Sequence, residues 1–260
     1  MAVKEQPEDD AERSESASRQ TRLVRLVKPV VKLENEARPI DTTIIAPKFY
    51  NAFNYSVLSR DRSVVNLTVG VTSANRGDGK TLVASNLAVS LATANERDTV
   101  IVDLNVAEPA IHRIFGVDLA PGLAEAIIGP NIAVARTRIP HLSVLTAGAD
   151  MVGPILASGG LSEAIHKHGP ISPTLGLEHV AEFRNVLYSL REVFEFVIVD
   201  MPSMKEPEVP VLLSHQVDGV LVVVSANQTT REEVDRMVHR IHDERVLGFV
   251  LNGVDDEEGS

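Results

Sequence analysis

From Val64 onward, short runs of valine, isoleucine and leucine alternate with longer stretches of helical periodicity, an order that few folds can accommodate. The predicted strands are Asn66 to Ser73, Thr99 to Leu104, Leu142 to Thr146, Phe196 to Met201, Gly219 to Ser225 and Val246 to Leu251. The predicted helices are Lys48 to Ser59, Lys80 to Ala94, Leu123 to Ile128, Val180 to Val193, Pro207 to Leu213 and Thr230 to Asp243. Continuous apolar strands are typical of sheets buried on both faces. The pattern therefore predicts a layered α/β fold, with a mostly parallel sheet and helices on both faces.

The chain divides by composition into a polar start, one apolar domain and an acidic end. With 260 residues, 44% of them hydrophobic, a single core is the simplest expectation. Residues 1–44 are predicted to be a disordered and linker tail, because their first twenty residues contain too little apolar material to repay chain ordering. Residues 45–254 form the predicted domain, with an irregular surface excursion at 147–177, and residues 255–260 form an acidic tail.

A basic stretch interrupts the polar start. Its basic residues, Arg19, Arg22, Arg25, Lys28 and Lys32, alternate with leucines and valines at roughly helical spacing. One interpretation is an amphipathic foothold on an anionic membrane or on a partner. The other is a solvated linker, which Pro29 and the nearby glutamates favour, since proline interrupts a helix and the glutamates dilute the charge.

Composition excludes several classes of function. The chain has no cysteine, so disulfides, thiolate metal sites and cysteine nucleophiles are impossible, which fits a reducing compartment. It shows neither a secretory leader pattern nor an apolar run long enough to span a bilayer, so the cytosol is expected, with peripheral attachment to the inner face of the plasma membrane as an option. The net charge of −11 argues against binding to nucleic acid, because that affinity depends on lysine and arginine.

The strongest local signal follows the first predicted strand of the domain. The segment Ala74-Asn75-Arg76-Gly77-Asp78-Gly79-Lys80-Thr81 has the spacing of a phosphate-binding P-loop, with alanine in place of the first glycine. It lies between an apolar strand and an amphipathic helical pattern, the context that such a loop requires. Its backbone N–H groups and the helix N-terminus are suited to phosphates. Lys80 is expected to bridge the β- and γ-phosphates of ATP, and the Thr81 hydroxyl to bind Mg²⁺.

Two aspartates are predicted to face this loop. Asp103 and Asp200 each follow an apolar strand directly, and ligands of open α/β sheets bind beyond the carboxyl ends of the strands. Either carboxylate alone has an ordinary alternative, which is to cap the next turn. Together with the loop, they indicate a site in which both hold Mg²⁺ or orient the attacking group. Further along, Thr229 or Thr230 with Glu233 reads as a helix cap.

Together these segments resemble the cytoplasmic ATPase domain of bacterial tyrosine kinases, the capsular exopolysaccharide family, within the wider group of MinD- and ParA-like ATPases. The similarity covers about residues 45–254 and includes IVDLNVAEPAIHRIFGV, LSVLTAG, FEFVIVDMPS, DGVLVVVSANQTTREEV and LGFVLNGV in the same order. The resemblance implies that Asp200 is the Walker B carboxylate and that Asn252 contacts the adenine. It also implies a catalytic set of Lys80, Asp103 and Asp200, and a metal set of Thr81, Asp103 and Asp200.

The chain departs from that family in three places. Asn105 and Ala107 stand where the family has the second aspartate and the arginine of an Asp-x-Asp-x-Arg run, and a neutral amide adds no charge at a metal. The end of the chain reads DDEEGS and lacks the family's tyrosine cluster. Asn51, Asn54 and Val57 replace the family's Glu-Arg-Arg ring motif. These departures argue against tyrosine-kinase activity and predict that ring assembly by that route fails, while self-association by another route stays open.

The leading hypothesis is an ATP-binding protein of exopolysaccharide or capsule synthesis or export, with a membrane-embedded chain-length protein as partner. The alternative is a nucleotide-dependent regulator or scaffold of the same machinery, in which occupancy is the signal. A MinD/ParA-like partition ATPase is a third possibility, which Asn75 disfavours because those proteins carry a lysine there.

Overall fold

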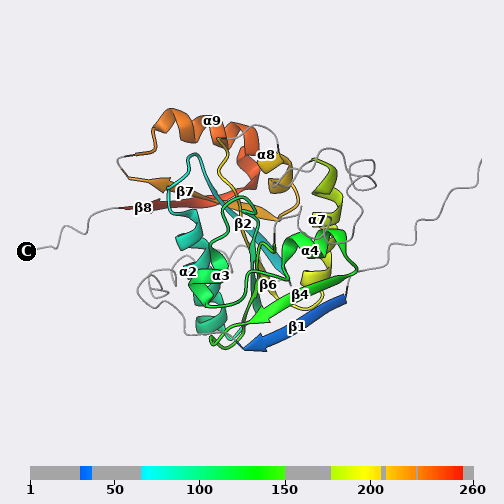
Figure 1. Ribbon diagram of the computed structural model, residues 1–260. Helices are drawn as coiled ribbons and strands as arrows, with labels where there is room; N and C mark the ends of the chain where they lie inside the picture. Colours follow the sequence, from blue (N-terminus) through cyan, green and yellow to red (C-terminus); the bar gives the residue numbers. More distant parts are fainter. Residues whose placement is uncertain (1–29, 37–65, 150–176, 206–208, 227, 254–260) are drawn as a thin grey trace, which may run out of the picture.

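The computed structural model describes residues 30–36, 66–149, 177–205, 209–226 and 228–253 (Figure 1). Within these ranges the strands are β1 (Val30–Glu36), β2 (Leu67–Ser73), β3 (Thr99–Asp103), β4 (Asn131–Arg136), β5 (Leu142–Leu145), β6 (Phe196–Asp200), β7 (Gly219–Ser225) and β8 (Val246–Asn252). The α-helices are α2 (Lys80–Asn95), α3 (Ile111–Phe115), α4 (Leu123–Ile128), α7 (Val180–Arg191), α8 (Val209–Ser214) and α9 (Arg231–Ile241). The 3₁₀ turns are η2 (Leu177–His179) and η3 (Asp243–Arg245).

All described strands belong to one sheet, in the order β1-β4-β5-β3-β6-β2-β7-β8. The six strands from β5 to β8 along this order run parallel, and β4 pairs with β5 in the opposite direction. β1 pairs with β4 in parallel. The predicted layered, mostly parallel sheet is therefore confirmed, with an antiparallel junction near one edge.

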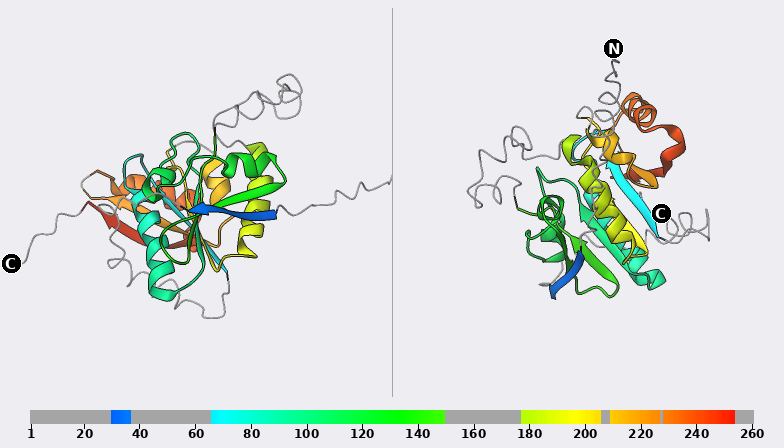
Figure 2. Two further views of the ribbon diagram at one scale, coloured as in Figure 1. Left: turned by 60° about the horizontal axis from the view of Figure 1, so that its bottom comes forward. Right: turned by 90° about the vertical axis from the view of Figure 1, so that its right-hand side faces the viewer.

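Helices cover both faces of this sheet (Figures 1 and 2). Residues of α2 and α3 pack into one apolar core, and residues of α4, α7, α8 and α9 pack into the other. The strands supply alternate residues to the two cores, because successive strand side chains point to opposite faces. In β6, for example, Val197 and Val199 join the α7 side while Ile198 joins the α2 side. This explains why the strands read as unbroken apolar runs.

Helix α2 differs from the amphipathic helix that the sequence predicts. Its residues from Val83 to Ala92 are all buried, so it lacks a polar face over that span. The small and uncharged side chains of Ser85, Asn86 and Ser90 make this burial possible, and Asn86 satisfies its amide by donating to the Leu82 carbonyl. α2 is thus an internal helix of the fold.

The structure adds three elements that the sequence analysis did not expect. α3 and β4 lie in stretches left unassigned, and β1 lies inside the predicted tail. Residues Val30–Glu36 are therefore a strand and neither a linker nor a helix; the other residues of the basic stretch, the predicted helix at Lys48 to Ser59 and most of the excursion lie outside the described residues. In the described part of the chain, no helix combines the length and apolar character needed to cross a bilayer.

Candidate functional site

The predicted phosphate loop connects the carboxyl end of β2 to the start of α2, as expected. Gly77 and Gly79 take left-handed backbone conformations, with φ of 86° and 91°. These values suit glycine, because a Cβ atom is strained there. Ala74 has no such requirement, and its side chain is buried in the core, so alanine fits at the place where this loop type has its first glycine. The loop thus has the conformational features that its sequence predicts.

Lys80 and Thr81 begin α2 directly after the loop. The Lys80 residue is only 7% exposed, whereas Thr81 is half-buried. Helix N-termini present free N–H groups and a partial positive charge, which favour anions. A buried lysine at the same point adds a full positive charge. These features together make this end of α2 suitable for a phosphate chain.

The two predicted aspartates lie side by side at the carboxyl edge of the sheet. Asp103 in β3 and Asp200 in β6 are register partners, and both are buried. Asp103 accepts three backbone hydrogen bonds, from Asn105 at 3.1 Å, Ala110 at 3.0 Å and Ile111 at 3.1 Å. It therefore holds the turn that leads into α3. This is the capping role that the sequence analysis gave as the alternative to a role at the metal. Burial raises the pKa of Asp103 despite these hydrogen bonds.

Asp200 has the opposite environment. It is 1% exposed, and both carboxylate oxygens lack a hydrogen-bond partner. Burial first and the charge of Asp103 second raise the pKa of Asp200 to about 7. The Thr81 hydroxyl and the Lys80 charge lower the pKa of Asp200, so both groups lie near its carboxylate. The Thr81 hydroxyl nevertheless makes no regular hydrogen bond with it. A buried carboxylate without partners is costly unless a cation or a proton compensates it.

These groups fit a magnesium ion that is shared with phosphate oxygens. Mg²⁺ prefers oxygen ligands and is commonly held by one or two carboxylates together with substrate phosphates. Asp200 and the Thr81 hydroxyl supply such oxygens beside the loop. Among the described residues, no group of three or more His, Cys, Asp or Glu side chains is placed to hold a metal unaided. The donor set therefore suits a metal that arrives with a nucleotide.

Asp78 is directed at its own loop. Its carboxylate is buried, and it accepts from the Asn75 backbone N–H at 2.9 Å and from the Thr229 hydroxyl at 2.9 Å. The Asn252 side-chain amide donates to the Asp78 carbonyl at 3.0 Å. Asn252, which the resemblance places against adenine, thus contacts the loop through its Nδ2 atom. The structure brings Asp78, Thr229 and Asn252 together from distant parts of the chain.

The first residues of the loop contact neighbouring loops. Arg76 forms an ion pair with Glu108, and both side chains are exposed. Hydrogen bonds from Thr230 and from the Asn75 side chain lower the pKa of Glu233. Glu233 and Thr230 form the predicted capping box of α9, which is confirmed. Arg76 in this arrangement points to Glu108, so its charge is shared with the loop after β3.

The residues that depart from the family motif lie in that same loop. Asn105 is half-buried, and its side-chain amide donates to the Glu108 carbonyl at 3.2 Å. Ala107 is exposed. Asn105 therefore helps to close the turn that Asp103 also holds. Asn51, Asn54, Val57 and the acidic end lie outside the described residues.

Sequence reasoning missed Thr229 and Glu108 as neighbours of the phosphate loop. The threonine pair before α9 was interpreted only as a helix cap, and Thr230 does perform that role. Thr229 contacts a residue 151 positions away, which no local pattern can reveal. Glu108 could have been identified only by its position in a loop that follows a strand-end aspartate.

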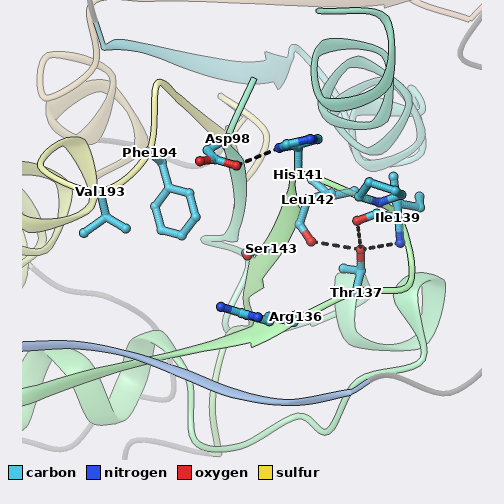
Figure 3. Close-up of a pocket in the computed structure, with 10 residues that line it drawn as sticks. Asp98, Arg136, Thr137, Ile139, His141, Leu142, Ser143, Val193 and Phe194 are labelled. Atoms are coloured by element: carbon cyan, nitrogen blue, oxygen red, sulfur yellow. Dashed lines mark hydrogen bonds and ion pairs between the residues drawn. The ribbon is translucent and has the colours of Figure 1, made fainter. Parts of the chain in front are cut away.

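A separate hollow of about 400 Å³ lies at the opposite edge of the sheet (Figure 3). Its lining includes Asp98 before β3, Leu142 at the start of β5 and Phe194 before β6. These residues lie at the amino-terminal ends of parallel strands, whereas the phosphate loop follows the carboxyl end of β2. The hollow is therefore distinct from the candidate nucleotide site.

No protein-family model matches the chain. Among curated proteins, it is 26% identical to the tyrosine-protein kinase ptk of Acinetobacter johnsonii over 68% of this chain. It is 25% identical to the succinoglycan biosynthesis transport protein ExoP of Rhizobium meliloti over 73% of this chain. The chain spans only 22% of the length of each of these two relatives. The tyrosine-protein kinase YwqD of Bacillus subtilis is 24% identical, with 85% of this chain and 90% of YwqD covered.

Solved structures similar to this chain also include bacterial kinase domains. The kinase domain of VpsO has a TM-score of 0.64 and 25% identity, covering 80% of this chain and 94% of that domain. Cobyrinic acid a,c-diamide synthase from Mycobacterium smegmatis, with a bound ATP analogue and magnesium, has a TM-score of 0.53 and 19% identity over 72% of each chain, a likeness of fold alone. The homologues of this chain include several bacterial tyrosine-protein kinases, and its fold is that of P-loop ATPases.

Proposed function

We propose that this chain binds Mg-ATP at the phosphate loop and acts in exopolysaccharide or capsule synthesis or export. The observation that carries the proposal is the pairing of a buried lysine at the start of α2 with a buried, unpartnered carboxylate at Asp200. Such a pair is suited to a phosphate chain on one side and a cation on the other. The name of one relative, the succinoglycan biosynthesis transport protein ExoP, supports the polysaccharide context.

Each residue of the proposed site has a distinct task. Backbone N–H groups of the loop, apart from the Asn75 N–H that donates to Asp78, cradle the phosphates, and Lys80 neutralises their charge. Bound magnesium would neutralise and orient phosphate oxygens, with Thr81 and Asp200 as its protein ligands. Asp103 supplies a second negative charge, as base or metal-side carboxylate, while it holds the turn that carries Asn105. Asn252 is proposed to contact adenine through its side-chain oxygen, because its Nδ2 atom donates to the loop.

The test is calorimetric titration of the purified protein with Mg-ADP and with a non-hydrolysable ATP analogue. Wild type is expected to bind both, and Lys80→Ala to lose binding. Arg136→Ala is the matched control, because it also removes one positive charge but lies at the opposite edge of the sheet (Figure 3). Absence of binding by wild type would contradict the proposal and leave a scaffold role.

The proposed adenine contact has its own test. Inorganic tripolyphosphate has no base. If Asn252 contacts adenine, Asn252→Ala should therefore weaken binding of the ATP analogue more than binding of tripolyphosphate. Equal weakening of both ligands would mean that Asn252 acts only on the loop.

A nucleotide-dependent regulator is the second candidate, and the Asn105 environment favours it. A neutral amide engaged with the Glu108 carbonyl adds no negative charge where the family has an aspartate. Incubation with labelled ATP separates the candidates. Label on the protein would refute a pure regulator, phosphate release without label would indicate an ATPase, and binding with neither would support the regulator.

The proposed setting is the cytoplasmic side of a membrane, beside a membrane-embedded chain-length or export protein. The relation to ExoP, of which this chain matches only part, supports a partner of that kind. Fractionation of cells with and without the candidate partner tests this. The chain should move to the membrane fraction only when the partner is present.

A further inference from the structure

We propose that Thr229 is a positioning residue of the phosphate loop, and that with Asn252 it holds the loop in the shape that receives phosphate. This inference rests on the proposed nucleotide site and concerns what sets its affinity. Thr229 acts through Asp78, to which its hydroxyl donates. The resemblance and the sequence pattern assign it no role beyond the start of a helix.

The first step is the connection between Thr229 and the loop backbone. The Thr229 hydroxyl donates to Asp78 Oδ1 at 2.9 Å, and Asp78 Oδ2 accepts the Asn75 N–H at 2.9 Å. Asp78 is 1% exposed, so water has little access to replace a lost partner. One buried carboxylate thus joins both ends of the loop, and its orientation depends on the threonine hydroxyl. Leaving a buried acceptor without its donor is costly.

The second step is that Thr229 is itself fixed. Its hydroxyl oxygen accepts the Ser225 N–H at 3.3 Å, and its own N–H donates to the Ser225 carbonyl at 3.1 Å. Ser225 ends β7, and the next residue, Ala226, donates to the Asn252 carbonyl at 2.7 Å. The hydroxyl is therefore held between a strand end and the loop, with its proton directed at Asp78.

The third step is the return contact. Asn252 at the end of β8 donates from its side chain to the Asp78 carbonyl at 3.0 Å. The contacts form a closed ring, from the end of β7 through Thr229 to Asp78, then through Asn252 back to β7. A Cβ on Gly79 would clash with Asn252 Nδ2, which shows how closely this side chain packs on the loop.

This arrangement predicts that Thr229, a residue far from the loop in sequence, helps to preorganise the loop through Asp78. Preorganisation raises affinity, because the ordering cost is met before the ligand binds. Thr229→Val has nearly the same shape but cannot donate or accept, whereas Thr229→Ser keeps the hydroxyl. The pair separates the hydrogen bond from packing.

The experiment measures Mg-ADP affinity by calorimetry for wild type, Thr229→Val and Thr229→Ser. We expect Thr229→Val to bind about tenfold more weakly, the cost of about one hydrogen bond, and Thr229→Ser to remain close to wild type. Thr137→Val is the matched control, since the Thr137 hydroxyl bonds Ile139 and Leu142 at the opposite edge (Figure 3). It should lose thermal stability without losing affinity.

A second measurement does not depend on nucleotide. Amide hydrogen exchange of the nucleotide-free proteins should show faster exchange for loop residues 74–81 in Thr229→Val, and wild-type rates in Thr229→Ser. If loop exchange is faster in Thr229→Val but wild type binds no nucleotide, the result would contradict the proposed function and still support the role of Thr229 in holding the loop. Unchanged loop exchange in a folded Thr229→Val protein would overturn the inference, as would serine failing to restore it.

Discussion

At the scale of single residues, two positions of the phosphate loop require glycine for different reasons. Gly77 and Gly79 share a left-handed backbone, but a Cβ would meet open space at Gly77 and the Asn252 side chain at Gly79. The first glycine is thus required for its backbone conformation alone. The second is also required because a neighbouring side chain packs against its Cα.

Alanine substitutions separate these two requirements. Gly77→Ala should lower the free energy of unfolding by about 1 kcal/mol, the usual cost of a left-handed residue with a side chain. Gly79→Ala should cost more, and Asn252→Ala in the same protein should remove the excess. Denaturant unfolding of nucleotide-free wild type, the three single variants and the Gly79→Ala/Asn252→Ala double variant measures these effects. Additive effects of Gly79→Ala and Asn252→Ala would contradict the packing argument.

Asp200 makes the stability of the nucleotide-free protein depend on pH. Its pKa in the folded state is about 7, above the ordinary value of 3.8, so the folded protein holds this proton more tightly than the unfolded chain does. The stability that the protonated group contributes is full below about pH 4 and is lost as pH rises through about 7. The slope in between is at most about 1.4 kcal/mol per pH unit for one proton.

Asp200→Asn should remove this dependence, because asparagine stays neutral. In the absence of magnesium and nucleotide, the variant should gain stability over wild type between about pH 5 and about pH 8. Urea unfolding across that range measures the difference. Asp235→Asn, a change at an exposed carboxylate, should follow wild type; parallel pH profiles for wild type and Asp200→Asn would refute the assignment.

At the scale of elements, α7 shows how one helix face anchors to the sheet. Phe183, Val186, Leu187 and Leu190 are buried in the core that α4 and α9 share, while the neighbouring Tyr188 is 54% exposed. The apolar residues recur at helical spacing, as the sequence predicts. The binding energy of this helix to the sheet therefore comes from one stripe.

Adjacent substitutions in α7 test that division. Leu187→Ala should cost about 2–5 kcal/mol in unfolding free energy, because it leaves a cavity in a closed core. Tyr188→Ala should change stability by no more than about 0.5 kcal/mol. Thermal or urea denaturation measures both. A large loss at Tyr188 would indicate that this exposed ring is packed in the full molecule.

The same comparison shows what the sequence can and cannot predict about elements. Strands buried on both faces, such as β6 and β7, were found within a residue because apolar runs leave no alternative. β1 was missed because Pro29 and the nearby glutamates favoured a solvated linker over an amphipathic helix, although in sequence Val31 and Leu33 alternate with Lys32 and Glu34 with the period of a strand. β4 was missed because its six residues lie between turn signals and include only two large apolar side chains, Ile132 and Val134.

The candidate site divides in a similar way. Lys80, Thr81 and Asp200 could be predicted because each follows a strand or begins a helix, and the sheet brings such positions to one edge. The contacts of Asp78 with Thr229 and Asn252 could not, since they join residues more than 150 positions apart. Asp103 was identified by position, but its three backbone hydrogen bonds depend on how the following turn folds.

At the scale of the whole molecule, the site is assembled from several crossings of the sheet. The phosphate loop follows β2, the aspartates end β3 and β6, and the supporting residues lie beyond β7 and at the end of β8. A ligand bound there contacts or constrains most of the parallel strands. Binding should therefore stabilise the domain as a unit.

Mg-ADP at about one hundred times its dissociation constant should add about 2.7 kcal/mol to the unfolding free energy. For a domain of this size, that corresponds to a rise in melting temperature of about 5–10 °C. Thermal denaturation with and without Mg-ADP measures it. Lys80→Ala should show no rise, and a rise of wild-type size in that variant would mean that the ligand binds elsewhere.

The ring of contacts around Asp78 also bears on biosynthesis. The phosphate loop leaves the ribosome long before Thr229 and Asn252, which follow it by 151 and 174 residues. Domains are made from the N-terminus, and long-range contacts form only when both partners exist. The nascent chain therefore carries the loop sequence without its supports, and the ring of contacts is complete only when β8 has been translated.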